Sequence, residues 1–172
     1  AVLRWHVFPL HWPESGVCSC GNPNCGRSSA KHPLTPNGLK DATTNPEQIR
    51  NWWTRWPDAN IGIVTGKVSG IVVVDVDPEK GGMESWVDLQ DIHGRIDTLT
   101  SLTGGGGMHL WFQAPADELK STAGTMGPGL DTRAEGGYAV ASPSLHISGQ
   151  GAEGEGEEGM QLPLLHIYRC RT

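Results

Sequence analysis

A short apolar run that ends in two carboxylates most constrains how this chain folds. In the segment GIVVVDVDPEKGG, residues 70–82, four consecutive β-branched residues are typical of a strand buried on both faces, and a proline and glycines end it. Because side chains alternate along a strand, Asp75 and Asp77 share one face at its C-terminal end. Two like charges this close repel unless a cation lies between them. The segment therefore predicts a divalent metal site, with two solvated acids in a turn as the alternative.

A second constraint comes from residues 13–40, a loop rich in Cys, Gly and Pro that is too polar to build a core by itself. Its spacing C-x-C-x4-C-x6-H supplies four sulfur and nitrogen ligands, namely Cys18, Cys20, Cys25 and His32. This pattern is typical of a tetrahedral, structural Zn2+ site, in which the metal supplies the cross-link that apolar residues do not. A Cys18–Cys25 disulfide and free thiols are the alternatives. Cys170 is isolated and has no assigned role.

Two helices are predicted from local signals. The first follows the capping residue Asn45, ends before Pro57, and carries apolar residues at the i, i+3, i+4 spacing of one buried face. The second is expected from about residue 82 to residue 92, with Gly94 after its last turn. Between them lie two predicted strands, which places the paired carboxylates in the middle of the folded part of the chain.

The length of 172 residues suits one well-buried domain, which we expect over residues 1–150. Residues 151–172 form a Gly/Glu-rich stretch with a short apolar end, and we interpret them as an atypical tail left by truncation or rearrangement. No apolar run approaches membrane-spanning length, and the first residues lack the pattern of a signal peptide. The formal net charge of -6 argues against indiscriminate nucleic-acid binding. We therefore expect a cytoplasmic protein with no membrane association.

A run of four glycines, residues 104–107, separates two further predicted strands. Glycine lets the backbone approach a ligand closely, and exposed N–H groups in such a turn suit phosphate, although no Lys-Ser/Thr follows as in a P-loop. His109 lies in the strand after this turn, where a structural and a functional role are both open. Further polar candidates follow in the segment GLDTRAEGGYAVASPSLHISG, namely Asp131, Arg133, Ser142, Ser144 and His146.

Seven segments follow one another between residues 5 and 149: CSCGNPNCG with KHP, GLKDATTNPEQIRNWW, NIGIVTG, IVVVDVD, TGGGGMH, GLDTR and SPSLHISG. In their order and density they resemble the bifunctional DNA primase/polymerase (prim-pol) N-terminal domain family of phages and plasmids, within the archaeo-eukaryotic primase superfamily. The resemblance implies an α/β (α+β) fold with a mixed or antiparallel RRM-like sheet flanked by helices and a small zinc-stabilised N-terminal loop. Residues 1–150 would then be the primase/polymerase catalytic domain.

The same resemblance implies roles for individual residues. The expected catalytic residues are Asp75, Asp77, His109 and Asp131. The three carboxylates form an oxygen-only set that suits Mg2+ or Mn2+, and two such ions about 4 Å apart suit nucleotidyl transfer. For Arg133, an ion pair with Glu135 is the alternative to binding the triphosphate. The expected nucleotide-binding residues are Thr103, Gly106, Gly107, His109, Arg133, Ser142, Ser144 and His146.

The predicted function is therefore template-directed nucleotidyl transfer, the synthesis or extension of primers on single-stranded DNA. Its expected partners are a single-stranded DNA template and primer, nucleoside triphosphates, and a helicase domain or protein. One alternative is a metal-dependent phosphodiesterase or nuclease that uses the same carboxylates with water as the nucleophile. Another is a zinc-stabilised nucleic-acid-binding module without catalysis, although pure binding does not require a carboxylate cluster.

Overall fold

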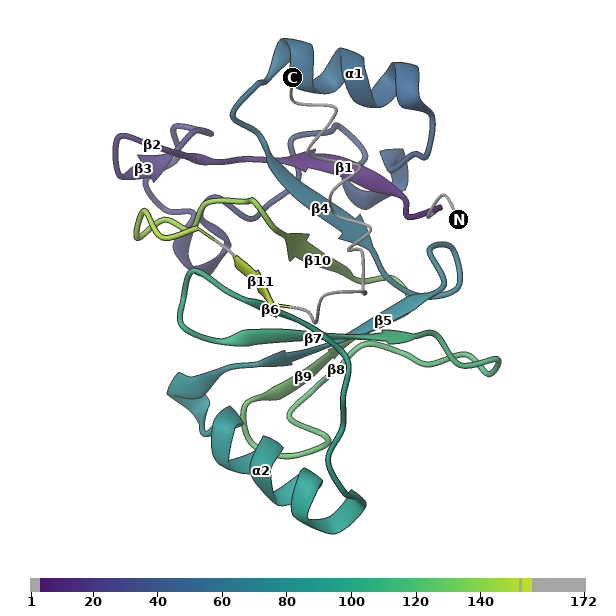
Figure 1. The fold of residues 1–172 in the computed structure, drawn as a ribbon. Helices are drawn as coiled ribbons and strands as arrows, with labels where there is room; N and C mark the ends of the chain where they lie inside the picture. The colour runs from purple at the N-terminus through teal and green to yellow at the C-terminus, as the bar shows by residue number, and fades with distance from the viewer. Residues whose placement is uncertain (1–3, 152, 156–172) are drawn as a thin grey trace.

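A computed structural model describes residues 4–151 and 153–155 of the chain. Over these residues the chain forms two larger antiparallel sheets, a small two-stranded hairpin and two α-helices (Figure 1). The predicted α+β class, with antiparallel pairing and few helices, is confirmed. No helix in the described part is both long and apolar enough to cross a membrane.

The larger sheet has the predicted apolar strand near its centre. Its spatial order is β11-β6-β7-β5-β9-β8, and every neighbouring pair runs antiparallel. The central strand is buried along almost its whole length, as its unbroken valines predict. The strands of this sheet are β5 (Ile71–Val76), β6 (Leu99–Leu102), β7 (Met108–Gln113), β8 (Thr122–Ala123), β9 (Leu130–Arg133) and β11 (Glu153–Glu155).

The smaller sheet has the order β1-β4-β10, with β1 (Val7–Leu10), β4 (Asn60–Val64) and β10 (Tyr138–Ala141). One of its faces shares a hydrophobic core with the larger sheet, in which Ile61 and Ile63 pack with Val73 and Trp111. The two sheets therefore face one another across this core. A hairpin of β2 (Pro13–Glu14) and β3 (Val17–Cys18) begins the cysteine-rich loop.

The helices lie at opposite ends of the molecule (Figure 1). Helix α1 (Pro46–Arg55) begins as predicted, because the Asn45 side chain accepts the backbone N–H of Glu47 at 2.9 Å. Its buried Trp53 joins the core between the sheets. Helix α2 (Gly82–His93) packs Trp86 on the other face of the larger sheet. Three short 3-10 helices complete the elements, η1 (Gly26–Ser28), η2 (Gly38–Asp41) and η3 (Pro78–Lys80).

The predicted tail lies mostly outside the described residues. Within it, β11 pairs with the edge strand β6, so that Glu153 lies opposite Leu102 and Glu155 opposite Thr100. A domain boundary at residue 150 stays a prediction.

Candidate functional site

The strand register places three of the predicted residues in one row. His109 on β7 lies directly opposite Asp75 on β5, and Asp75 lies directly opposite Asp131 on β9. Because directly opposed residues project to the same face of a sheet, all three side chains point toward the smaller sheet. The distance from His109 Nε2 to Asp75 Oδ1 is 3.6 Å. Three segments far apart in the sequence thus contribute to one polar row.

Arg133 joins the two carboxylates of this row. It lies two residues after Asp131 and therefore on the same face. Its Nη2 is 3.1 Å from Asp75 Oδ2 and 3.2 Å from Asp131 Oδ2. Glu135, the alternative partner, instead accepts the backbone N–H of Lys67 at 3.0 Å. Two carboxylate oxygens thus already converge on one cationic group, and their donor chemistry fits a divalent cation at the same place.

Asp77 has a different environment. It follows the last residue of β5 and caps η3, where its Oδ1 accepts the backbone N–H of Glu79 at 3.1 Å. Its Oδ2 lies 2.5 Å from Lys80 Nζ. The repulsion expected between Asp75 and Asp77 is thus offset in this structure by a separate basic partner for each acid.

His109 is buried, with 9% of its surface exposed. Burial lowers the pKa of its imidazole, because the charged form loses hydration, while the negative charge of Asp75 acts in the opposite direction. The positive charges of Arg133 and Lys31 lower the pKa further. A neutral imidazole carries one N–H donor and one acceptor nitrogen, so His109 can donate a hydrogen bond without adding charge to the site.

The glycine turn is held together by Thr103. The Thr103 carbonyl accepts the N–H of Gly106 at 2.9 Å, and the Thr103 side-chain Oγ1 accepts the N–H of Gly107 at 3.1 Å. A Cβ at Gly107 would overlap the Val76 carbonyl oxygen, so only glycine allows the turn to pack against the end of β5. Within the described residues, the N–H groups that form no hydrogen bond in this turn are those of Gly104 and Gly105. These two amides are the ones available to a phosphate in this conformation.

The segment after β10 lies against the glycine turn. Ser148 Oγ donates to the Gly104 carbonyl at 3.2 Å, and a Cβ added at Gly104 would overlap His146. Burial lowers the pKa of His146, and the charge of Lys31 lowers it further. Ser144 Oγ accepts the backbone N–H of Ile61 at 2.9 Å, which is a structural contact. Ser142 Oγ is buried and has no hydrogen-bond partner among the residues that the structure describes.

The cysteine-rich loop brings its four predicted ligands together. The ligand atoms of Cys18, Cys20, Cys25 and His32 all lie within 4.8 Å of one another. His32 Nε2 is 3.4 Å from Cys18 Sγ and 3.7 Å from Cys25 Sγ. A tetrahedral Zn2+ with usual bond lengths separates sulfur and nitrogen ligands by about 3.6 Å, so these residues fit the metal. Backbone N–H groups of Ala30 and Asn22 each lie 3.3 Å from a ligand sulfur, and such contacts stabilise thiolates.

The thiols in this cluster are free. Cys20 Sγ and Cys25 Sγ are 2.9 Å apart, which is longer than a disulfide bond of about 2.05 Å. Their shared hydrogen bond is the main reason that the pKa of Cys20 is lowered while that of Cys25 is raised to about 12. The two sulfurs are therefore joined by one hydrogen bond, and metal binding requires loss of the proton that forms it.

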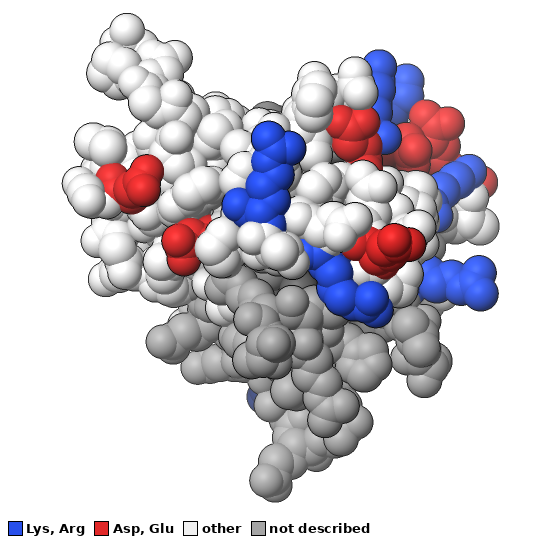
Figure 2. Space-filling model, turned by 90° about the horizontal axis from the view of Figure 1, so that it is seen from above, with Lys and Arg blue, Asp and Glu red and all other residues white. Residues whose placement is uncertain are grey.

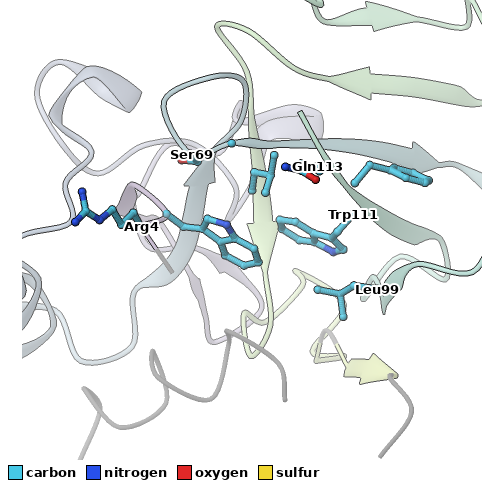
Figure 3. A pocket seen from close by; sticks show the side chains of 9 residues that line it. Arg4, Ser69, Leu99, Trp111 and Gln113 are labelled. Atoms are coloured by element: carbon cyan, nitrogen blue, oxygen red, sulfur yellow. The ribbon is translucent and has the colours of Figure 1, made fainter. Parts of the chain in front are cut away.

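A pocket of about 390 Å3 lies farther along the same face of the larger sheet (Figure 3). Trp111, two residues after His109 on β7, forms one side of it with Leu99, and Arg4 lies on the opposite side (Figure 3). Trp5 stacks on Trp111 with ring centroids 5.6 Å apart. Trp111 is buried, and its Nε1 donates to Ser101 Oγ at 3.0 Å, so its position is fixed mainly by packing.

Sequence reasoning missed Lys31 and Asn60. Lys31 precedes the predicted ligand His32, and its charge acts on both His109 and His146. Asn60 is 1% exposed and donates from Nδ2 to the carbonyls of Ala30 and Leu145, at 2.9 and 2.8 Å. Lys31 could have been found from its position beside the predicted zinc ligand His32. Asn60 could have been found because it is a polar residue at the start of an apolar strand.

A search of curated proteins found no match to this chain. The sequence profile of the bifunctional DNA primase/polymerase N-terminal domain matches residues 1–163 of the 172. The match includes the polar row, the glycine turn and the cysteine cluster. The chain therefore belongs to the bifunctional DNA primase/polymerase family.

Proposed function

We propose that this domain is a template-directed nucleotidyltransferase that synthesises or extends a primer on single-stranded DNA. Membership of the family supports a DNA primase/polymerase role in general. The observation that carries the finer proposal is the convergence of Asp75 and Asp131 on one cationic group beside the buried His109. Adjacent carboxylates of this kind hold divalent cations in enzymes that transfer phosphoryl groups.

The carboxylates would hold Mg2+ or Mn2+. Asp75 and Asp131 offer oxygen ligands from adjacent strands, and Asp77 becomes a third ligand if it leaves Lys80. When bound, the ions activate the primer 3′-hydroxyl and stabilise the leaving pyrophosphate. Arg133, which pairs with both acids in this structure, would bind the triphosphate, because its paired N–H donors suit phosphate oxygens.

The triphosphate would lie against the neutral His109 and the glycine turn. The imidazole donates one hydrogen bond, and the N–H groups of Gly104 and Gly105 offer two more donors. His146 lies beside the same turn. Thr103 would contribute indirectly, because its side chain stabilises the glycine turn. Ser144 would also contribute indirectly, because it anchors the segment that carries His146.

The DNA strand would occupy the space beside the polar row. The described part of the face on the α1 side is a poorer surface for DNA. Basic and acidic side chains are interspersed on it without a continuous basic patch (Figure 2). Replication of a phage or plasmid and cooperation with a helicase are further parts of this proposal, and they follow from the family resemblance alone.

The test is incorporation of labelled nucleotides on primed and unprimed single-stranded DNA with Mg2+ or Mn2+, together with pyrophosphate release. Asp75→Asn and Asp131→Asn keep the side-chain shape but remove the charge, and both should reduce incorporation to background. Asp88→Asn, on the exposed side of α2, is the matched control and should retain activity. Incorporation that persists without Asp75 and Asp131, or cleavage of DNA with no incorporation by the parent, would overturn the proposal.

A further inference from the structure

The cysteine cluster is hydrogen-bonded to the segment that carries His146. The N–H of Ala30 lies 3.3 Å from Cys18 Sγ, and the Ala30 carbonyl accepts from Asn60 Nδ2 at 2.9 Å. The same Asn60 amide donates to the Leu145 carbonyl and accepts the Leu145 N–H, both at 2.8 Å. One buried side chain therefore connects the residue before Lys31 to the residue before His146.

The backbone of Lys31 is fixed on its other side as well. Its carbonyl accepts the Tyr138 hydroxyl at 3.0 Å, and the carbonyl of the next residue, His32, accepts the N–H of His11 at 2.9 Å. Tyr138 belongs to β10, and the backbone of Val140 on the same strand interacts with His109. The Lys31 backbone thus lies against the strand that borders the polar row.

The Lys31 side chain acts on this region through its charge. The residue is partly buried, and its ammonium lowers the pKa of both His109 and His146. Among the residues that the structure describes, Lys31 forms no ion pair. Lys31 thus carries a positive charge, its backbone is held against β10 and, through Ala30 and Asn60, to the segment that carries His146, and no acidic residue of the described protein pairs with it. Such a position favours an anion.

We propose that Lys31 binds a phosphate group of the incoming nucleoside triphosphate, and that the zinc loop serves to place it there. This inference rests on the proposed function and deepens it. Zinc fixes Cys18, Cys20, Cys25 and His32 relative to one another, so it fixes the short segment that leads from the cluster to Lys31. Metal occupancy in the loop and nucleotide affinity at the polar row are therefore coupled.

The experiment measures the affinity of the zinc-loaded domain for a non-hydrolysable nucleoside triphosphate in the presence of Mn2+. Lys31→Met removes the charge but keeps most of the stem, and it should weaken binding by about 10-fold or more, the usual effect of losing a charged hydrogen bond. Lys31→Arg retains a cation and should keep most of the affinity. Lys40→Met, at an exposed position of η2, is the matched control and should bind like the parent. Zinc content is measured for every variant.

Removal of zinc tests the coupling. The zinc-free parent should fall to about the affinity of Lys31→Met, whereas the zinc-free Lys31→Met should lose little more, because both changes remove the same contact. Equal affinity for Lys31→Met and the parent overturns the assignment of Lys31. An additive loss in the zinc-free Lys31→Met overturns the coupling.

A second titration, with a short single-stranded oligonucleotide, separates the two sources of phosphate. The affinity of Lys31→Met for DNA should be close to that of the parent. If Lys31→Met instead loses affinity for DNA and keeps its affinity for the nucleotide, Lys31 binds a DNA phosphate and the proposal is wrong. These binding measurements do not depend on turnover. Lys31-dependent nucleotide binding without any incorporation would contradict the proposed function while leaving this inference standing.

Discussion

Arg133 gives the sharpest test of how the polar row is held together without a divalent ion. Its guanidinium donates to Asp75 and Asp131 at 3.1 and 3.2 Å, and these acids lie directly opposite each other on β5 and β9. In Arg133→Gln the two carboxylates face each other without a cation. Charged hydrogen bonds contribute about 1.5–3 kcal/mol when buried, and exposed ion pairs about 0–1 kcal/mol.

The exposure of the groups decides between these limits. The side chain of Arg133 is 38% exposed, and those of Asp75 and Asp131 are 27% and 23% exposed. An intermediate loss of about 1–2 kcal/mol in unfolding free energy is therefore expected. For a chain of this size it corresponds to a fall of about 2–8 °C in Tm.

The assay is thermal unfolding of the zinc-loaded protein, first without Mg2+ or Mn2+ and then across a Mn2+ titration. Because a divalent ion replaces the missing positive charge, Mn2+ should stabilise Arg133→Gln more than the parent. Arg50→Gln, at an exposed position of α1, controls for the loss of a surface arginine. An unchanged Tm in the metal-free variant, or the same Mn2+ stabilisation in variant and parent, would refute the argument.

Two further predictions concern titratable groups. In the zinc-stripped protein, the thiol of Cys20 should react with iodoacetamide faster than that of Cys25, because the pKa of Cys20 is lowered and that of Cys25 is raised to about 12. Peptide mass spectrometry after short pulses of iodoacetamide measures both rates. Equal rates would contradict a hydrogen bond shared between the two sulfurs. Because burial lowers the pKa of His109 below its usual 6.5, the unfolded chain binds a proton that the folded protein excludes, so stability should fall as the pH drops below 6.5. In denaturant unfolding without divalent ions, His109→Gln should lose less stability between pH 7.5 and pH 5.5 than the parent, and identical pH dependence would argue against a buried neutral imidazole.

The features that the sequence predicted well are those encoded locally. The cap at Asn45 and the spacing of the apolar residues define α1 within about a dozen residues. The four predicted zinc ligands lie within 15 residues of one another, Cys18 to His32, and only a short loop has to close to bring them together. In both cases the interacting groups are close in the chain, so their spacing carries the geometry.

The partners of the carboxylates depend on contacts that spacing does not encode. Lys80 lies only three residues after Asp77, so that pair was visible in principle. Arg133 lies 58 residues from Asp75, and the two meet only because β5 pairs with β9 in one register. A shift of one residue in that register would turn Arg133 and Asp131 to the opposite face. The sequence thus predicted which residue types the site needs, but sheet pairing decides which of them meet.

The cysteine cluster lies on the side of the fold that faces the polar row. Asp75, His109 and Asp131 stand on the larger sheet, whereas the residues opposite them come from β10, the segment that follows it and the cysteine-rich loop. Asn60 joins that loop to the Leu145 segment across 85 residues of sequence. Loss of zinc should therefore leave the row of catalytic candidates on its sheet while releasing Lys31 from the side of the site that faces it. On the proposed function, a metal in the cysteine cluster would therefore affect nucleotide affinity through Lys31 and would not need to touch the nucleotide itself.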